Sequence, residues 1–433
     1  MQCSPKPGSS AEADAARWPQ GPGRDAVDIA RIVIVGGGQA AGWAAKTLRD
    51  QGYAGALALV GDEPHPPYER PPLSKAVLAG TAAAPQTHLF KGDLLAGLRL
   101  DWRRGRRALR LDRGTRTIVL DDGEVLSFDR LLIATGGRAR PLPLDTVVPI
   151  HTLRSLDDAQ ALRARLQPGA RVLVIGGGWI GLEVAATACA AGLTAHVVES
   201  AARLCARVLP PELSARLHAL HLRHGVGFSL GTEVRDLSPR NGAVRATLRD
   251  GTHLDADVVV AGTGMLANDE LARDAGLACA EGILVDARCA TFDPAIFAAG
   301  DVARVQTRWA ADPLRLESWQ NAQDQGIAAA KAMLGHDIRY DPVPRFWSDQ
   351  HGVNLQIVGL PALGDTLVLR GHLDQGPGLA FALRDGVVRA AVGFNAGREM
   401  RPARNLVEKG AVVDPARLAD ATVPLASVET AGR

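Results

Sequence analysis

Cysteine and lysine are both scarce in this sequence. The 433 residues include five cysteines, and none of them stands in a C-x-x-C pair or at metal-ligand spacing. This usage argues against a disulfide framework, offers no metal site, and favours a reducing compartment, here the cytoplasm. Arginine supplies nearly all of the positive charge, since only six lysines occur, and Lys75 is one of them.

Long apolar runs and a strong net charge are also absent. No stretch of about 18 apolar residues is free of glycine and charge, so we expect no membrane-spanning helix. The net charge of +2 does not favour nucleic acid or a membrane surface as partner, and "RRGRR" at 103–107 is typical of a solvated edge. Residues 1–30 lack the features of a signal peptide, and their composition predicts a disordered extension. Nothing in the composition indicates an oligomeric state.

Two stretches of the chain repeat one pattern. "IVIVGGGQAAGWAA" (32–45) and "VLVIGGGWIGLEVAATA" (172–188) each join an apolar β-branched run, a glycine-rich turn and small residues at helical spacing. The first glycine makes the turn, the second lets the backbone approach a pyrophosphate, and the small third residue packs helix against strand. The positions assigned to this pattern are Gly36, Gly38, Ala40 and Ala41 in the first copy, and Gly176, Gly178, Ile180 and Gly181 in the second.

An acidic residue follows each turn at the end of the next predicted strand. These residues are Asp62 and Glu199, and each is placed to accept hydrogen bonds from ribose hydroxyls. Two complete units predict two bound dinucleotides, one of which donates electrons to the other.

The whole chain predicts an α/β fold with three domains. We expect one Rossmann-like domain at 31–143 and 263–335, a second at 144–262, and an α+β interface domain with an antiparallel sheet at 336–433. Hairpins are predicted at 116–128 and 244–264 and a helix at 318–334. The five prolines that precede Lys75 in the stretch 63–80 predict no regular element there.

Further stretches carry a resemblance to a known family. They include "LVGDEPHPPYERPPLSK", "GTGMLANDELA", "IFAAGDVA", "RLESWQNAQDQG" and "FWSDQHGVNLQIVGL". From Arg31 to the C-terminal domain, the sequence resembles the FAD-dependent, NAD(P)H-linked ferredoxin reductases of bacterial oxygenase systems, within the two-dinucleotide-domain flavoproteins. It is most similar to those that serve Rieske-type aromatic-ring dioxygenases.

The resemblance implies a reaction and its partners. A hydride would pass from NADH to FAD, and the flavin would deliver single electrons to a [2Fe-2S] ferredoxin that feeds a dioxygenase. One alternative is a ferredoxin that serves a cytochrome P450, and another is a slowly turning redox-sensing flavoprotein. Disulfide reductases of the superfamily carry a redox cysteine in the loop that reads "PYERPPLSK" here, so electrons should leave this flavin directly. The arginines considered for docking an acidic ferredoxin are Arg304, Arg308, Arg315, Arg345 and Arg398.

The resemblance also implies site residues. FAD would meet the first glycine turn together with Asp62, Arg70, Lys75, Ala108, Arg140, Asp301 and Trp319. NAD would meet the second turn together with Glu199, Arg203, Arg207 and Gly264. Asp301 is alternatively, or in addition, the N-cap of a helix. Trp319 is alternatively a core aromatic residue, and Trp347 is evenly balanced between the core and the flavin side.

Glu183 is an acid among apolar neighbours in the second predicted helix. A buried, unpaired carboxylate is costly, so it should have a cationic partner or be protonated. We expect a Lys75–Glu183 ion pair beside the flavin ring, with both residues contributing to catalysis. The alternative is a partly solvated glutamate at the mouth of the cleft.

Overall fold

The computed structural model describes residues 29–374 and 376–430. The extension expected at 1–30 lies outside the described residues, apart from positions 29 and 30.

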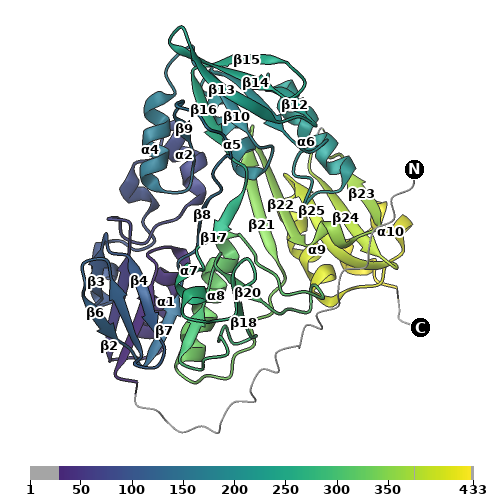
Figure 1. The fold of residues 1–433 in the computed structure, drawn as a ribbon. Coiled ribbons are helices and arrows are strands. Elements are labelled where there is room, and N and C mark those ends of the chain that lie inside the picture. The colour runs from purple at the N-terminus through teal and green to yellow at the C-terminus, as the bar shows by residue number, and fades with distance from the viewer. Residues whose placement is uncertain (1–28, 375, 431–433) are drawn as a thin grey trace, which may run out of the picture.

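The molecule contains two five-stranded parallel sheets (Figure 1). The first has the order β19-β7-β1-β2-β3, formed by Ile296–Ala298, Arg130–Ile133, Arg31–Val35, Ala56–Gly61 and Asp101–Arg104. The second has the order β12-β11-β10-β16-β9, formed by Gly227–Leu230, Thr194–Glu199, Arg171–Ile175, Val258–Ala261 and Ile150–His151. Four strands of each follow the same order, but the fifth strand comes late in the chain in the first sheet (β19) and precedes the central strand in the second (β9). The repeated sequence pattern is therefore a repeated structure, in which β1 and β10 are the central strands.

Each parallel sheet carries a three-stranded antiparallel meander at the same point of its topology. In the first it consists of β4 (Ala108–Asp112), β5 (Thr117–Leu120) and β6 (Val125–Ser127), and in the second of β13 (Val234–Arg240), β14 (Ala243–Leu248) and β15 (His253–Ala256). Both hairpins predicted from the sequence are therefore confirmed. Two short pairs complete these parts: β8 (Gly137–Ala139) with β17 (Met265–Ala267), and β18 (Ile283–Val285) with β20 (Ala303–Val305).

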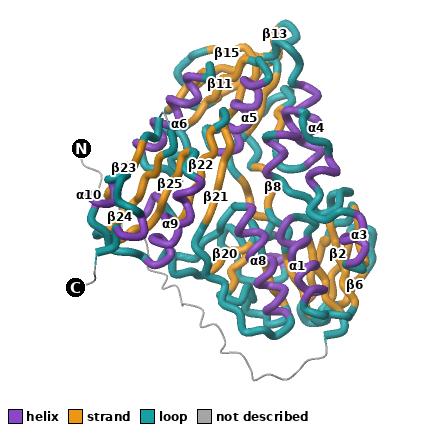
Figure 2. Tube along the Cα trace, turned by 180° about the vertical axis from the view of Figure 1, so that it is seen from behind, coloured by secondary structure: helices purple, strands orange, loops and turns teal. Residues whose placement is uncertain are grey.

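Helices cover the parallel sheets. They are α1 (Gln39–Asp50), α2 (Ala76–Ala79), α3 (Gly92–Gly97), α4 (Leu156–Arg165), α5 (Trp179–Ala190), α6 (Pro211–Arg223), α7 (Glu270–Asp274) and α8 (Trp319–Met333). Seen from behind, α1 and α8 lie side by side (Figure 2). Their close approach requires glycine at Gly326, where a Cβ would come within 2.4 Å of the carbonyl oxygen of Ala40.

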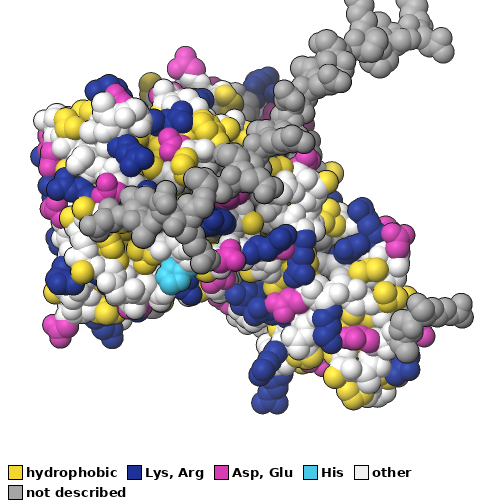
Figure 3. Space-filling view, turned by 90° about the horizontal axis from the view of Figure 1, so that it is seen from below, with side chains coloured by type: hydrophobic (Ala, Val, Ile, Leu, Met, Phe, Trp, Pro, Cys, Tyr) yellow, Lys and Arg dark blue, Asp and Glu magenta, His cyan; other side chains and the backbone are white. Residues whose placement is uncertain are grey.

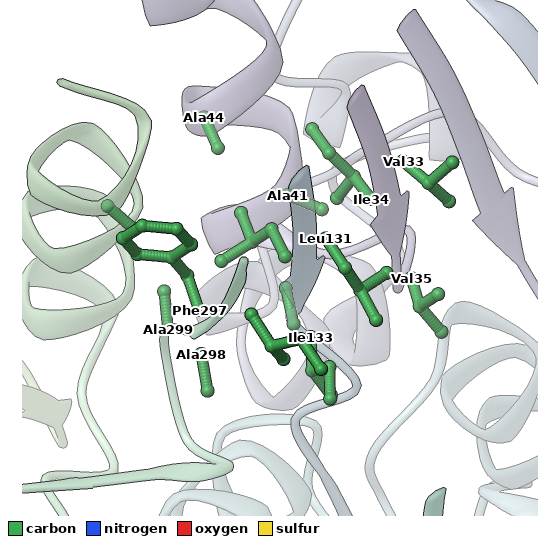
Figure 4. Close-up of a cluster of buried hydrophobic side chains, with 14 of the residues drawn as sticks. Val33, Ile34, Val35, Ala41, Ala44, Leu131, Ile133, Phe297, Ala298 and Ala299 are labelled. Carbon is green, nitrogen blue, oxygen red and sulfur yellow. The ribbon is translucent and has the colours of Figure 1, made fainter. Parts of the chain in front are cut away.

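The core of the first sheet is built from short apolar side chains on neighbouring strands. Ile34 on β1 and Ile133 on β7 are fully buried, and Phe297 on β19 belongs to the same apolar cluster (Figure 4). Because β19 comes from residues far along the chain, this core joins two separated segments.

The C-terminal sheet is antiparallel, as predicted. Its order is β21-β22-β25-β24-β23, formed by Arg345–Gln350, Val353–Gly359, Val387–Phe394, Gly378–Arg384 and Thr366–Gly371, with α9 (Gly397–Lys409) and α10 (Pro415–Ala419) beside it. Leu213 and Leu217 of α6 share one apolar cluster with Ile357 and Phe394 of this sheet. This buried contact fastens the C-terminal sheet to the second parallel-sheet unit.

The proline-rich stretch differs from the prediction. Its prolines lead directly into a 3-10 turn, η1 (Pro71–Ser74), which is followed by the short helix α2. Proline fits the first turn of a helix because no intrahelical partner is needed for the missing N–H there. Within 29–374 and 376–430, none of the helices combines the length and the apolar character needed to cross a membrane.

Candidate functional site

One large cavity lies where the two glycine turns face each other. Its volume is about 1640 Å³, well above the roughly 300–1,000 Å³ of an ordinary single-ligand pocket. It is lined by both turns, by the loop before Lys75, by the start of α8 and by β21. The candidate residues that line it are Gly36, Gly38, Ala40, Asp62, Arg70, Lys75, Ala108, Arg140, Gly176, Gly178, Ile180, Glu183, Glu199, Arg207, Gly264, Asp301 and Trp319.

The two turns have matching backbone geometry. Gly36 and Gly176 have φ values of +123° and +113°, and a Cβ would lie 2.1 Å from the carbonyl oxygen of Ala134 or 2.4 Å from that of Gly262. Only glycine fits both positions. Helices α1 and α5 begin directly after the turns, at N-caps that have no side-chain hydrogen bond. Their first N–H groups therefore remain available to an anion in the cavity.

Ala41 and Gly181 hold the small third position of each turn and do not line the cavity. A Cβ on Gly181 would come within 2.2 Å of the carbonyl oxygen of Gly176, whereas Ala41 is accommodated fully buried. The difference between the two turns thus lies in how closely helix packs on strand.

The two acids occupy different registers. Ile175 pairs with Val198, which puts Glu199 next along the strand, but Val35 pairs with Val60, and the next residue there is Gly61. Asp62 therefore lies one residue further out; its side chain is 61% exposed and 3.8 Å from Arg107. Glu199 accepts hydrogen bonds from the backbone N–H groups of Gly177 at 2.6 Å and Ala201 at 2.7 Å. These bonds fix the Glu199 carboxylate beside the second turn.

Arg70 is held by residues that the sequence analysis did not select. Its guanidinium donates to Glu63 at 2.6 Å, to the hydroxyl of Tyr68 at 3.1 Å and to the carbonyl oxygen of Arg154 at 2.5 Å. Tyr68 in turn donates to Glu63, and burial raises the pKa of its phenol. Glu63 comes directly after Asp62 in the chain, and this position was the one feature of the sequence that could have marked it as a site residue.

Asp301 does not cap a helix, so this alternative was wrong, while its contact with the flavin stays a prediction. Strand β20 follows it, and the helix that begins nearest is α8, whose N-cap is Ser318. Asp301 instead forms an ion pair with Arg154 at 2.9 Å, and its side chain is 15% exposed. At the start of α8, Trp319 meets Trp347 edge to face, with ring centroids 5.5 Å apart. Both tryptophans line the cavity.

The predicted Lys75–Glu183 ion pair is present. Lys75 Nζ lies 2.7 Å from Glu183 Oε2, and the Glu183 side chain is only 4% exposed, so the solvated alternative is excluded. Two hydroxyl groups also donate to this carboxylate: Ser74 to Oε2, and Ser348 to Oε1 at 2.5 Å. The charge is therefore fully compensated in a buried position. Neither serine was found from the sequence.

Two predictions about arginines need correction. Arg203 does not line the cavity; it donates to the carbonyl oxygens of Leu209 and Ala206 and to the hydroxyl of Ser214, which fastens its own loop. In the run at 103–107, Arg106 and Arg107 line the cavity rather than forming only a solvated edge.

The described cysteines are free thiols. Cys205 lines the cavity, but burial raises its pKa strongly, which keeps it a poor nucleophile. Among the described residues, no cluster of His, Cys, Asp and Glu could hold a metal ion.

Comparison with known proteins gives the family. Residues 30–326 match the pyridine nucleotide-disulphide oxidoreductase family, and residues 345–429 match the reductase C-terminal family. The chain is 42% identical to the ferredoxin–NAD(+) reductase component of the anthranilate 1,2-dioxygenase system of Burkholderia cepacia, over 91% of this chain and 98% of that one. This chain belongs to the ferredoxin–NAD(+) reductases. It is an oxidoreductase that uses a flavin and NAD.

Other relatives agree on the family and differ in the system served. The reductase component of the 3-phenylpropionate/cinnamic acid dioxygenase of Photorhabdus laumondii is 39% identical, over 88% of this chain and 97% of that one. Putidaredoxin reductase, in its covalent complex with putidaredoxin, has a TM-score of 0.88 and 37% identity, over 92% and 97% of the chains. The ferredoxin reductase for the CYP199A2 system of Rhodopseudomonas palustris has a TM-score of 0.89 and 36% identity, over 93% and 100%.

Proposed function

We propose that this protein is an FAD-dependent NADH:ferredoxin oxidoreductase that supplies a [2Fe-2S] ferredoxin of an aromatic-ring dioxygenase. The observation that carries the proposal is the single cavity in which both dinucleotide turns meet around the Lys75–Glu183 pair. We assign FAD to the domain at 31–143 and 263–335, NAD to 144–262, and the interface role to 336–433. The proposed location is the cytoplasm, since the described cysteines are free thiols.

The residues of the first turn suit a dinucleotide. Glycine at position 36 keeps a Cβ out of the backbone, and the N-terminus of α1 offers unpaired N–H groups to a diphosphate. Gln39, at the start of α1, lines the cavity, and neither of its buried amide atoms has a hydrogen-bond partner among the described residues. Buried polar atoms normally find a partner, so this amide suits a polar ligand.

The protein's own groups have separate tasks. A bound flavin supplies the ability to accept a hydride as an electron pair and to release electrons singly. Lys75 provides a compact positive charge at the cavity wall, and Glu183 holds that charge in place. Arg207 and Glu199 flank the second turn, where Glu199 suits a ribose 2′-hydroxyl and repels a 2′-phosphate. Trp319 and Trp347 offer apolar surface to the cavity.

The ferredoxin surface is less defined than the cavity. None of the five candidate arginines lines the cavity, and four of them already have partners: Arg304 with backbone carbonyls, Arg308 with Asp341, Arg315 with Glu317 and Arg345 with Asp324. Arg398 is exposed at the start of α9. Figure 3 shows basic and acidic side chains close together on the face seen from below. Because four of the five arginines already have acidic or carbonyl partners, we propose docking by a mixed surface in which these arginines contribute part of the positive charge.

The second candidate differs in the system served. The likeness to a reductase for a CYP199A2 system favours a ferredoxin that feeds a cytochrome P450. Steady-state reduction by NADH should be compared for a Rieske-type ferredoxin and for a ferredoxin of a P450 system. We expect a higher kcat/KM with the Rieske-type protein. A higher kcat/KM with the other ferredoxin would favour service to a cytochrome P450. Failure to turn over repeatedly with either ferredoxin would reject both candidate functions.

A further inference from the structure

The C-terminal sheet reaches the buried ion pair through one strand. β21 packs against α5 (Figure 1). Its residues Ser348 and Gln350 are buried on one face of the strand, while Asp349 between them is exposed. Ser348 is fully buried and donates to Glu183 Oε1 at 2.5 Å, although 165 residues separate the two in sequence. A residue of the C-terminal sheet thus donates a hydrogen bond directly to the Glu183 carboxylate.

A chain of hydrogen bonds continues from Ser348 away from the cavity. Gln350 Nε2 lies 2.8 Å from Ser348 Oγ, and Gln350 Oε1 lies 2.6 Å from Nε2 of His221 on α6. His221 Nδ1 is 3.1 Å from Nε2 of His351, in the turn between β21 and β22. The chain therefore joins the loop of Lys75, α5, β21 and α6.

The carboxylate fixes the direction of every bond in this chain. An ionised carboxylate only accepts, so the single hydroxyl proton of Ser348 goes to Glu183 and its oxygen accepts from the Gln350 amide. Gln350 Oε1 then accepts from His221, which must carry its proton on Nε2. His221 Nδ1 is left as an acceptor for the Nε2 proton of His351. The negative charge at Glu183 thereby determines the tautomers of two histidines.

Both histidines lie in surroundings that favour their neutral form. Burial lowers the pKa of His221 to about 4 and that of His351 to about 3, and neighbouring histidines act in the same direction. The groups that face the pair are His218 from α6, His224, which is the C-cap of that helix, and the uncharged Phe228 from β12. The ring of His224 stacks on that of His351 at 4.2 Å. A proton on His221 Nδ1 would face the Nε2 proton of His351, so the chain requires His221 to be neutral.

We propose that Ser348 and Gln350 are positioning residues, which orient the Glu183 carboxylate toward Lys75 and are themselves oriented by the neutral His221–His351 pair. The C-terminal sheet then has a part in the redox site besides partner docking. The functional half of this inference rests on the proposed role of the Lys75–Glu183 pair. The bond directions rest only on the geometry and on the charge of Glu183.

The bond directions can be read from the histidine rings of the flavin-loaded protein. Long-range ¹H–¹⁵N correlation spectra of ¹⁵N-histidine-labelled protein, assigned with His221→Asn and His351→Asn, distinguish Nε2–H from Nδ1–H tautomers. We expect both rings as Nε2–H tautomers that do not titrate between pH 6 and 8. In Ser348→Ala and Glu183→Gln the His221 signals should move toward a mixture of tautomers, whereas Asp349→Asn should leave them in place. An Nδ1–H tautomer of His221, or unchanged signals in Ser348→Ala, would overturn the proposal.

The positioning role has a kinetic readout. Ser348→Ala should slow the reduction of bound flavin at saturating NADH about tenfold, because the carboxylate loses one charge-assisted hydrogen bond. The KM for NADH and the flavin content should not change, and Asp349→Asn should behave as the unmodified protein. An unchanged rate in Ser348→Ala contradicts positioning. If Lys75→Ala also reduces its flavin normally, the proposed role of the ion pair fails instead, while the histidine tautomers still test the chain.

Discussion

Replacing Lys75 should lower both the stability of the protein and the rate at which its flavin is reduced. In Lys75→Met, Glu183 keeps its two serine donors but loses the ammonium group 2.7 Å away, in a place where the glutamate side chain is 4% exposed. Breaking a buried pair costs about 3–5 kcal/mol in general. Because the Lys75 side chain is 21% exposed and the serines remain, we expect a loss of about 2–3 kcal/mol in the free energy of unfolding. Reduction of the flavin by NADH should slow by at least about tenfold, or roughly 1.4 kcal/mol.

The double variant Lys75→Met/Glu183→Leu sharpens this prediction. Apolar side chains of similar volume often replace a buried ion pair without loss of stability. The double variant should therefore recover part of the stability, and not all of it, because the buried hydroxyls of Ser74 and Ser348 lose their acceptor. Reduction of the flavin should stay slow because the cation is still missing. Urea unfolding followed by tryptophan fluorescence and anaerobic stopped-flow reduction measure the two effects on the same samples.

A matched control is available in the same part of the chain. Lys46 forms an i,i+4 ion pair with Asp50 on the outer side of α1, where the Asp50 side chain is 53% exposed. Lys46→Met should cost no more than about 0.5 kcal/mol and leave the rate unchanged. If Lys75→Met matches this control in both stability and rate, the buried Lys75–Glu183 pair contributes to neither, contrary to the prediction.

Four further outcomes are expected. Acid or heat should release free FAD, since no cysteine or histidine stands in the loop "PYERPPLSK" for a covalent link, and colour retained by the precipitate would contradict this. NADH should exceed NADPH in kcat/KM, and Glu199→Ala should narrow the ratio by about tenfold as the charge facing a 2′-phosphate is lost; equal use by the unmodified protein would reverse the assignment. Added salt should slow ferredoxin reduction more steeply than ferricyanide reduction, and parallel responses would count against charged docking. Acid should destabilise the protein. Burial lowers the pKa of His221 to about 4, so as the pH falls the unfolded chain binds a proton at this histidine before the folded protein does. The free energy of unfolding should therefore fall by about 2 kcal/mol between pH 7 and 5. In His221→Asn, the free energy of unfolding measured with urea should fall less over that pH interval. An equal fall in the variant would show that other groups cause the acid destabilisation.

The sequence was sufficient for the parts that rest on local patterns. Both glycine turns, the predicted hairpins and the antiparallel C-terminal sheet follow from spacing and turn residues. The Lys75–Glu183 pair was also predictable, because an acid in an apolar helix requires a partner, lysine is rare in this chain, and the resemblance to ferredoxin reductases implies that the loop of Lys75 lies at the flavin. These features could be predicted because each shows in a short stretch of sequence, either as a local pattern or as a residue unlike its neighbours.

The parts that were missed depend on contacts between distant segments. Ser74 and Ser348 meet the same carboxylate from 109 and 165 residues away, and serine is too common to stand out. Arg203 has the right position in the chain but points into its own loop, where carbonyl groups bind it. Asp301 follows a buried strand as expected, yet β20 rather than a helix comes next, so the short pattern "GDVA" was ambiguous.

Rapid anaerobic mixing reveals the order in which electrons move, from NADH to the flavin in the cavity and then to a ferredoxin. The FAD-loaded protein is mixed with NADH and, in a second push, with a [2Fe-2S] ferredoxin, while the visible absorbance of the flavin is followed. We expect this order: NADH bleaches the flavin faster than steady-state turnover, and the colour returns as two ferredoxin molecules are reduced for each NADH. Ferredoxin reduction that precedes the bleaching, or a bleached flavin that ferredoxin does not reoxidise, would contradict it.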